Sequence, residues 1–506
     1  MHGLIFGGLR ENMIGDDISI RRSIGAHKIA TFLREHHYDI EVLDYIHAWT
    51  LEELQTYTMS RVHVDTLFFG FSSTFTIESP VVNEFVQWLR KTYPSIPTVS
   101  GSQNNSMIGL GCDWMIFGFG EYAILELLQY FQGGKEPVHT NRIINCYDNY
   151  RAFPKSDLTV RYQERDHISD REILLLEFSR GCKFECAFCS FPVLGVKEDH
   201  TRSADNLYDE LLSNYEKHGT EHYIVLDETF NDSSEKIAKY AEVIRKLPFQ
   251  PKLTGYIRAD LLVSRPKDWD NLIDMGFCSH FYGVESFNNA SAKAIGKGMN
   301  TSKLQDGLLE VDEYFRKNAG YYKGHISLIA GLPHETLESL RESVSWIHKY
   351  WYKNSCVMNT LMIKDFDSPV HELTHFSKFD KSWKDYGYKE FEYPNDLQIN
   401  SKYSNYYEKL DHILKNKEYG YIGWDNGNIT IVDAIQFCAN EFDTDAIYKY
   451  NNIDPFTFDK FFIDPDVSWT MLMGSSLGPE RRENINRFIY EYKVKKLTLT
   501  NKGETL

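Results

Sequence analysis

Short apolar runs alternate with amphipathic stretches over roughly the first 130 residues. In the stretch at 21–38 the apolar residues recur at helical spacing: Ile24, Ile29, Ala30, Phe32 and Leu33. The apolar runs predict strands at residues 4–7, 39–45, 66–73, 96–101 and 113–118. Strands that alternate with helices build a parallel sheet, so residues 1–132 are predicted to form a doubly wound α/β domain. Its ligand crevice would lie where the strands end in Gly or Ser.

A second alternating series begins at residue 173, after a connector at 133–172 in which the periodicity is lost. Its apolar runs predict strands at residues 173–178, 222–226, 252–257, 280–284, 325–330 and 356–363. The clearest helix covers 301–317, with Thr301 or Ser302 as the expected N-cap and one apolar face: Leu304, Leu308, Val311 and Phe315. Six strand–helix units over residues 173–370 predict a partial (β/α)6 barrel rather than the closed eight-unit form.

Regular periodicity fails in the last part of the chain, residues 371–506. This region is rich in Tyr, Asn, Asp and Lys, and its pattern favours helices near 403–416 and 480–492. We expect a mixed, mainly helical region that packs over the barrel. It holds no repeat and no motif from which a role could be inferred.

Composition and charge disfavour nucleic-acid binding, membrane association and secretion. The chain has 506 residues, of which 42% are hydrophobic, enough to bury several cores. A net charge of −17 disfavours long-range attraction to nucleic acid or to anionic membranes. No apolar run is long enough to span a bilayer, and the start MHGLIFGGLREN becomes charged too early for a secretory signal. We therefore expect a cytoplasmic protein, without a membrane partner, whose cysteines are reduced.

Three of the eight cysteines lie close together in GCKFECAFCSFP, at Cys182, Cys186 and Cys189. Thiolates are soft ligands for zinc, copper(I) or iron–sulfur clusters. Structural zinc needs a fourth ligand, for which His200 is the nearest candidate, and a redox dithiol needs only two cysteines. A [4Fe–4S] cluster with one open iron fits three, because clusters that only carry electrons usually have four. The other five are expected to be small buried hydrophobes: Cys112, Cys146, Cys278, Cys356 and Cys438.

The run SRGCKFECAFC, residues 179–189, resembles the CxxxCxxC signature of radical S-adenosylmethionine (SAM) enzymes, which follows the first strand of a partial barrel. In that family the open iron chelates the amino and carboxylate groups of SAM. One electron then splits SAM into methionine and a 5′-deoxyadenosyl radical. The barrel must hold the target close and exclude solvent and oxygen. Phe184, Phe188 and Phe191 suit such shielding, and ordinary packing of the loop on the barrel explains them equally well.

Further motifs resemble the family in order and spacing. LDETF (226–230) resembles the acidic motif near the SAM amino group, and IRADLL (257–262) the Arg-x-Asp after the third strand. GVESFN (283–288) resembles the motif near the ribose and carboxylate, and GLPHET (331–336) the turn that borders the adenine, with His334 in place of the usual glycine. The resemblance implies these SAM-binding residues: Asp227, Glu228, Arg258, Glu285, Ser286, Lys297, Gly331 and Pro333.

The first domain resembles the Rossmann-like cobalamin-binding domain of B12-dependent radical SAM proteins. The matching segments are GAHKIATFLREHHYDIEVLDY, VSGSQNN and GFGEYAILELL. They imply these residues near cobalamin: Gly101, Ser102, Gly118, Gly120 and Glu121. The Asp-x-His-x-x-Gly motif that supplies an axial histidine is absent, and His27 and His47 are expected to be exposed helix residues. Two interpretations stay open, namely cobalamin bound without that histidine and a scaffold that no longer binds it.

The resemblance implies a radical SAM enzyme, with cobalamin, that methylates or rearranges an unactivated position in a small molecule or peptide. Its electron donor would be a protein such as flavodoxin or ferredoxin. One alternative is a methylthiotransferase-like enzyme that modifies RNA. Against it, such enzymes carry a second cysteine set in the first domain, where only Cys112 and the nearby Cys146 occur. The other alternative is a non-enzymatic binding protein that a metal stabilises.

Overall fold

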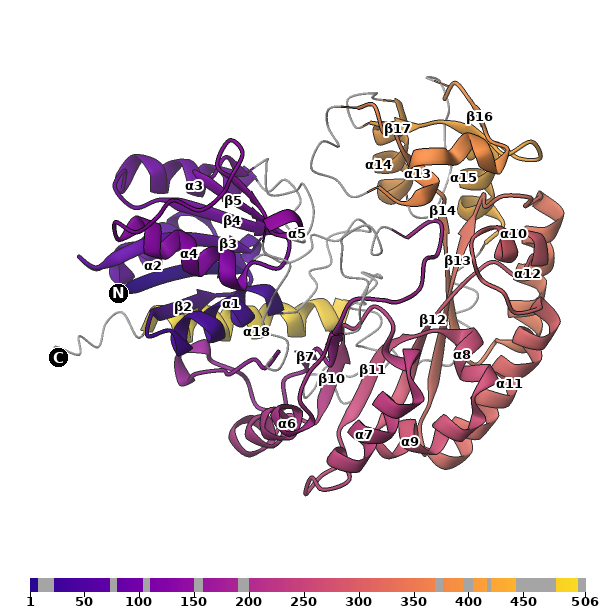
Figure 1. Ribbon diagram of the computed structural model, residues 1–506, viewed down its shortest axis with the longest axis horizontal. Helices are drawn as coiled ribbons and strands as arrows, with labels where there is room; N and C mark the ends of the chain where they lie inside the picture. Colours follow the sequence, from indigo (N-terminus) through magenta and orange to yellow (C-terminus); the bar gives the residue numbers. More distant parts are fainter. Residues whose placement is uncertain are drawn as a thin grey trace.

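A computed structural model covers the chain. It describes residues 1–7, 22–72, 80–102, 110–149, 158–189, 200–368, 376–394, 404–415, 420–442 and 479–498. Two six-stranded sheets organise these residues, and Figure 1 shows them on opposite sides of the molecule.

The first sheet has the strand order β2-β1-β3-β4-β5-β6, and all of its strand pairs are parallel. This is the predicted doubly wound arrangement, in which the order reverses at β1 and β3. One strand, β6, lies in the stretch that was expected to be a connector. The strands are β1 (His2–Gly7), β2 (Asp39–Leu43), β3 (Thr66–Ser72), β4 (Thr98–Ser102), β5 (Trp114–Phe117) and β6 (Ile143–Asn145).

Helices cover both faces of the first sheet. α1 and α4 share one apolar cluster, through Ala30, Leu33 and Leu127, whereas α2 and α3 share the other, through Leu54 and Phe85. Burial on both faces explains why the strands read as continuous apolar runs. The helices are α1 (Ile24–Glu35), α2 (Leu51–Arg61), α3 (Pro80–Thr92), α4 (Glu121–Phe131) and the short α5 (Cys146–Asn149).

The second sheet has the order β14-β13-β12-β11-β10-β7, again entirely parallel. Neighbours in the sheet follow the chain order, as in a barrel, so the predicted partial (β/α)6 barrel is confirmed. The strands are β7 (Leu174–Leu176), β10 (His222–Val225), β11 (Lys252–Ile257), β12 (Phe277–Glu285), β13 (Lys323–Ala330) and β14 (Ser355–Thr360). The helices are α6 (Ala204–His218), α7 (Ser234–Ile244), α8 (Ala259–Ser264), α9 (Trp269–Asp274), α10 (Asn289–Ala294), α11 (Thr301–Asn318) and α12 (Leu337–Tyr350). A two-stranded ribbon of β8 (Ser179–Arg180) and β9 (His200–Thr201) flanks the barrel.

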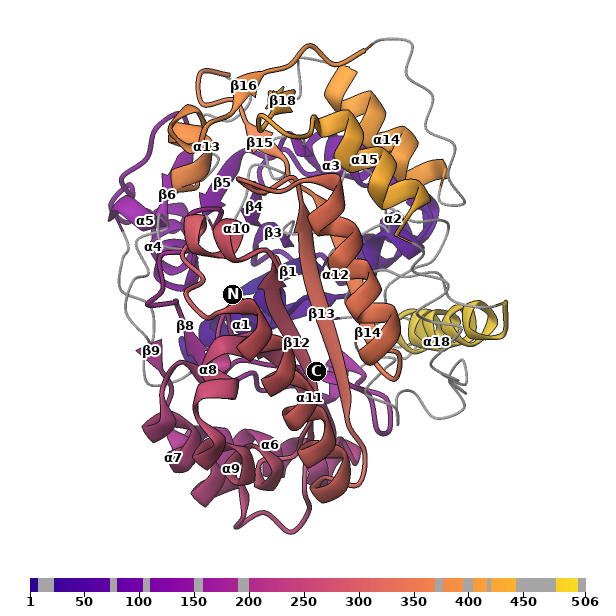
Figure 2. The same cartoon turned by 90° about the vertical axis from the view of Figure 1, so that its right-hand side faces the viewer.

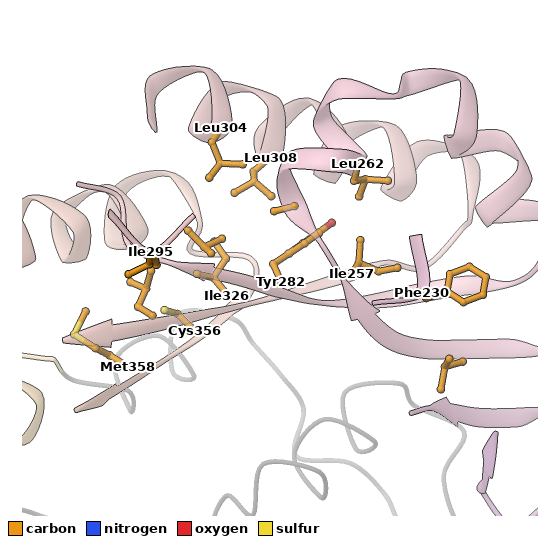
Figure 3. Close-up of a cluster of buried hydrophobic side chains, with 14 of the residues drawn as sticks. Phe230, Ile257, Leu262, Tyr282, Ile295, Leu304, Leu308, Ile326, Cys356 and Met358 are labelled. Carbon is orange, nitrogen blue, oxygen red and sulfur yellow. The ribbon is translucent and has the colours of Figure 1, made fainter. Parts of the chain in front are cut away.

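Helix α11 shows how the barrel core forms. Its predicted apolar face is buried, and Figure 3 shows Leu304 and Leu308 beside Leu262 of α8, above Tyr282 and Ile326 of the sheet. The predicted cap is wrong by one or two residues. The Asn300 side chain, not Thr301 or Ser302, accepts the first free backbone N–H groups of the helix.

The C-terminal region divides between the two sheets. Its described elements before α18 gather at the carboxyl ends of the barrel strands (Figure 1, Figure 2). The run predicted as one strand at 356–363 splits there, because β15 leaves β14 and pairs with β17. These elements are β15 (Ile363–Lys364), α13 (Lys378–Ser382), β16 (Lys389–Glu390), α14 (Ser404–Lys415), β17 (Tyr421–Ile422), β18 (Trp424–Asp425) and α15 (Ile431–Asn440).

Helix α18 (Pro479–Thr498) returns to the first sheet, as Figure 1 shows. Phe488, Ile489 and Tyr492 join the apolar cluster under α2 and α3, and Lys496 is fully buried, where it donates to the carbonyl of Val42. The predicted helices near 403–416 and 480–492 are thus confirmed by α14 and α18. Among the described residues, no helix has the length and apolarity needed to cross a membrane.

Candidate functional site

A cavity of about 670 Å³ lies between the two sheets. Its wall comes from the first-sheet strands and α1, from the barrel strands β7, β11 and β12, from the segment after β10, and from the cysteine loop. Most of this wall is apolar, which favours ligand binding away from bulk water. Both domains therefore contribute to one site.

Cys182, Cys186 and Cys189 all lie on the cavity wall, half-buried and without disulfides. The loop turns tightly, since the Cys189 N–H donates to the Cys186 carbonyl over 3.1 Å. Ala187 holds it from both sides. Its N–H donates to the Ile295 carbonyl (3.0 Å), and its own carbonyl accepts the N–H of Phe379 in α13 (2.9 Å). The C-terminal region thus supports the loop directly.

Polar groups approach two of the sulfurs. The Arg258 Nη1 lies 3.4 Å from the Cys186 Sγ, and the Thr229 Oγ1 lies 3.5 Å from the Cys182 Sγ. The Arg258 guanidinium carbon also lies 4.1 Å from the centre of the Phe184 ring. A cationic group and a hydrogen-bond donor near a cysteine favour its thiolate form, which is the form that binds metals.

The three cysteines of the loop are the candidate ligands for a [4Fe–4S] cluster. In the described part of the chain, no three His, Cys, Asp or Glu side chains stand close enough to hold one metal ion. A four-iron cluster requires wider spacing, because each cysteine binds a different iron. The side chain of His200, the nearest candidate for a fourth zinc ligand, lies outside the described residues.

The structure separates the two neighbouring carboxylates of LDETF. Asp227 points into the barrel wall, where its oxygens accept from the Phe178 N–H (2.8 Å) and the Ser179 hydroxyl (2.5 Å). Glu228 lines the cavity and accepts the Gly181 N–H over 3.1 Å. Burial raises the pKa of Glu228 to about 7. Of this pair, Glu228 is the one that a ligand in the cavity can reach.

Glu285 and Lys297 also face the cavity. The register of β12 against β13 shifts between Gly283 and Glu285, and Glu285 takes a left-handed backbone with φ 68°. The Lys297 ammonium donates to the Gly283 carbonyl over 2.7 Å and lies 3.6 Å from the Glu285 carboxylate. Burial raises the pKa of Glu285. A strained, buried carboxylate at a cavity edge is typical of a binding site.

In the GLPHET turn, His334 takes the place of the usual glycine and adopts a left-handed backbone with φ 68°. Glu335 organises the turn by accepting the N–H groups of Gly331 (2.9 Å) and Leu332 (3.1 Å), and Ser286 donates to its other oxygen. Burial raises the pKa of Glu335 to about 7. Unlike Arg258, Glu285 and Lys297, the predicted residues Ser286, Gly331 and Pro333 lie outside the cavity wall.

All five residues expected near cobalamin line the first-sheet side of the cavity: Gly101, Ser102, Gly118, Gly120 and Glu121. A Cβ added at Gly101 would meet nothing nearer than the Ile116 carbonyl at 4.0 Å, so this wall is a cradle that a side chain would fill. Gly118, at φ 108°, turns the chain beside it. A flat ligand can approach such a backbone closely.

No histidine is found on the described cavity wall. The segments that follow β1, β3 and β4, residues 8–21, 73–79 and 103–109, contain none in their sequence. The expectation that His27 is exposed is wrong. His27 is buried, and its Nε2 lies 2.8 Å from a carboxylate oxygen of Asp44. The side chain of His47 lies outside the described residues.

The remaining cysteines are buried, as predicted: Cys112, Cys146, Cys278, Cys356 and Cys438. Cys112 and Cys146 belong to apolar clusters on different faces of the first sheet, so they do not form a second ligand set. Phe184 and Phe188 lie on the cavity wall, whereas Phe191 falls outside the described residues. Sequence reasoning missed Lys28, Glu177 and Arg180, which also line the cavity, because their partners are distant in the chain.

Comparison with known proteins agrees with this architecture. Residues 176–347 match the radical SAM superfamily. An uncharacterized methyltransferase of Pyrococcus horikoshii is 23% identical over 171 residues, which cover 34% of this chain and 36% of the relative. The chain thus matches about a third of that relative's length. The chain therefore carries a radical SAM domain, as the cysteine motif predicted.

Two solved structures share the fold over nearly the whole chain. One is the radical SAM methyltransferase TsrM from Kitasatospora setae with tryptophan and a SAM analogue bound (TM-score 0.61, 13% identity, 97% of this chain and 99% of that one). The other is the cobalamin-dependent SAM radical enzyme OxsB with aqua-cobalamin and SAM bound (TM-score 0.55, 14% identity, 98% and 72%). At these identities the likeness establishes the fold: a doubly wound domain joined to a radical SAM barrel.

Proposed function

We propose that this chain is a cobalamin-dependent radical SAM enzyme that methylates or rearranges an unactivated position in a small molecule or peptide. One observation carries the proposal. The three cysteines and the Gly-rich edge of the first sheet lie on the wall of a single cavity. Two cofactors that must act on one substrate need such a shared site. TsrM, a methyltransferase with this fold, was solved with tryptophan as substrate, which supports methyl transfer to a small molecule.

Cys182, Cys186 and Cys189 would hold a [4Fe–4S] cluster, whose chemistry is the one-electron cleavage of SAM. Around it the chain's residues bind and orient SAM. Glu228 would accept the SAM ammonium group, and Glu285 with Lys297 would bind its ribose and carboxylate. The other candidates act behind the wall: Asp227, Ser286, Gly331 and Pro333 hold the segments in place.

The first domain would hold cobalamin, which carries a methyl group, against Gly101, Ser102, Gly118, Gly120 and Glu121. The structures with this fold that contain cobalamin, TsrM and OxsB, support this assignment. Among the described residues, this wall offers cobalamin small residues and the Glu121 carboxylate, and no histidine. We place the enzyme in the cytoplasm, with flavodoxin or ferredoxin as electron donor.

Anaerobic reconstitution tests both cofactor sites. The wild-type chain should bind about four iron and four sulfide per chain and should retain hydroxocobalamin through gel filtration with a visible spectrum. Cys186→Ala should lose the cluster and keep cobalamin, while Cys278→Ala, a buried cysteine away from the cavity, should keep both. A colourless zinc protein, or a cluster that survives Cys186→Ala, would contradict the proposal.

A further inference from the structure

An ion pair crosses the boundary between the two domains at the cavity. The Arg180 Nη1 lies 2.6 Å from the Glu121 Oε1, and both side chains are more than nine-tenths buried. Glu121 is the first residue of α4 and closes the turn Gly118–Phe119–Gly120 of the first domain. Arg180, in β8, stands two positions before Cys182. The pair therefore joins the turn proposed for cobalamin to the start of the cysteine loop.

Arg180 is held on more than one side. Its Nε donates to both carboxylate oxygens of Glu177, over 3.0 and 3.2 Å. Its guanidinium carbon lies 4.3 Å from the centre of the Phe119 ring. Glu177 in turn pairs with Lys28 of α1, which is a second connection between the domains. These contacts give the guanidinium a single orientation, as expected for a planar group with several fixed donors.

Because the Arg180–Glu121 ion pair is buried, it is expected to contribute little net free energy to folding. Removing two charges from water offsets much of their attraction, and apolar residues of similar size often stabilise a protein as well or better. In some proteins a buried polar or ionic group instead fixes the geometry between the elements that it joins. Here those elements carry the ligands proposed for two different cofactors.

Glu121 also has unused hydrogen-bonding capacity. Its Oε1 pairs with Arg180, whereas its Oε2 is buried and has no hydrogen-bond partner among the described residues. Glu121 itself is 5% exposed and lies on the cavity wall. A buried carboxylate oxygen without a donor is costly unless a ligand supplies one. The primary amide side chains of a corrin are donors of that kind.

We propose that Arg180 is a positioning residue, which holds Glu121 so that the cobalamin-binding turn and the cysteine loop keep one fixed separation. The roles of the cofactors rest on the proposed function, but the link between the two segments does not. Arg180 itself lines the cavity, but the role proposed for it needs no contact between Arg180 and a cofactor. It acts through Glu121, whose free oxygen then has one defined place in the cavity.

The first test needs no cofactor. Hydrogen–deuterium exchange is measured on the apo chain for peptides that cover residues 118–131 and 179–189. Glu121→Gln removes the charge with little change in size, and it should speed exchange in the distant 179–189 segment by about tenfold, the factor for a link of about 1.4 kcal/mol. Glu126→Gln, on the exposed face of α4, should leave exchange unchanged. Unchanged exchange in 179–189 for Glu121→Gln would overturn the proposal.

The second test is a double-mutant cycle on cobalamin affinity, measured by visible titration with hydroxocobalamin. Arg180→Met should weaken binding about as much as Glu121→Gln does, and the double variant should be no weaker than either single one. Arg180→Lys, which keeps the charge, should recover part of the affinity. Additive losses, or full affinity in Arg180→Met, would overturn the proposal. If the wild-type chain binds no cobalamin, the proposed function fails, while the exchange result still decides the positioning role.

Discussion

The Nη1 atom of Arg258 lies 3.4 Å from the sulfur of Cys186. Asp260 fixes the guanidinium from the other side, over 2.8 and 3.0 Å. A positive charge beside a cluster favours the added electron, so its removal should make reduction harder. We predict that Arg258→Met assembles the cluster but shifts its midpoint potential to a more negative value, as measured by redox titration with electron paramagnetic resonance. Arg245→Met, on the surface with Asp274, is the control. An unchanged potential in Arg258→Met would contradict this role.

Glu335 should make the stability of the barrel depend on pH. Burial raises its pKa in the folded chain to about 7, above the ordinary value of 4.5. The folded state thus holds the proton more tightly, so the contribution of Glu335 to the free energy of unfolding is complete below about pH 4.5 and lost as the pH rises through about 7. The loss amounts to about 3 kcal/mol.

Glu335→Gln should remove the part of the pH dependence of stability that comes from Glu335. The glutamine oxygen can accept the N–H groups of Gly331 and Leu332, and its amide can donate to the Ser286 hydroxyl, so the turn keeps its hydrogen bonds. Urea unfolding at pH 5 and pH 8, followed by circular dichroism, gives the comparison. The wild-type chain should lose more stability between these values than the variant. Equal losses would mean that other groups set the dependence.

Gly101 should be required for cobalamin binding rather than for folding. A valine there would project into the cradle, because the nearest atom to its Cβ is 4.0 Å away. We predict that Gly101→Val weakens hydroxocobalamin binding by tenfold or more, about 1.4 kcal/mol, in equilibrium dialysis. Gly298→Val is the matched control, since that glycine also has open space around it but lies off the cavity wall. Full affinity in Gly101→Val would place the ligand elsewhere.

The C-terminal region should stabilise the GLPHET turn. Trp424 packs against Gly331 so closely that an added Cβ would lie 2.1 Å from its ring, and the Tyr388 hydroxyl donates to the Gly331 carbonyl. Trp424→Ala should cost about 3–5 kcal/mol of unfolding free energy, and Tyr388→Phe about 1 kcal/mol. Chemical unfolding followed by circular dichroism measures both. Tyr350→Phe, on the surface, is the control. A Trp424→Ala variant as stable as the wild type would exclude this support.

Periodicity predicted both sheets, because strands buried on two faces carry continuous apolar runs whatever their partners are. It missed β6, whose three residues lie in a polar stretch and depend on pairing with β5. Periodicity also did not predict that α18 packs against the first sheet. The Asp44 N–H donates to the Tyr492 hydroxyl 448 residues away, and no local pattern encodes such a contact.

In the candidate site, too, the sequence predicted the local features and missed those that depend on distant contacts. Cysteine spacing and motif order indicated the segments around the cavity, because these features are local. Which side chain faces the cavity depends on strand register and turn geometry, so sequence reasoning grouped Asp227 with Glu228 although only Glu228 lies on the wall. His27 was misjudged for a related reason, since its partner Asp44 lies after the next strand.

We expect the three-cysteine loop to support reductive cleavage of SAM. The direct measurement is the yield of 5′-deoxyadenosine per chain, by anaerobic incubation of the reconstituted protein with SAM and dithionite. We predict 5′-deoxyadenosine and methionine in equal amounts from the wild-type chain and from Cys278→Ala, and neither product above background from Cys182→Ala, Cys186→Ala or Cys189→Ala. Intact SAM after incubation with a chain that carries a full [4Fe–4S] cluster would contradict the account.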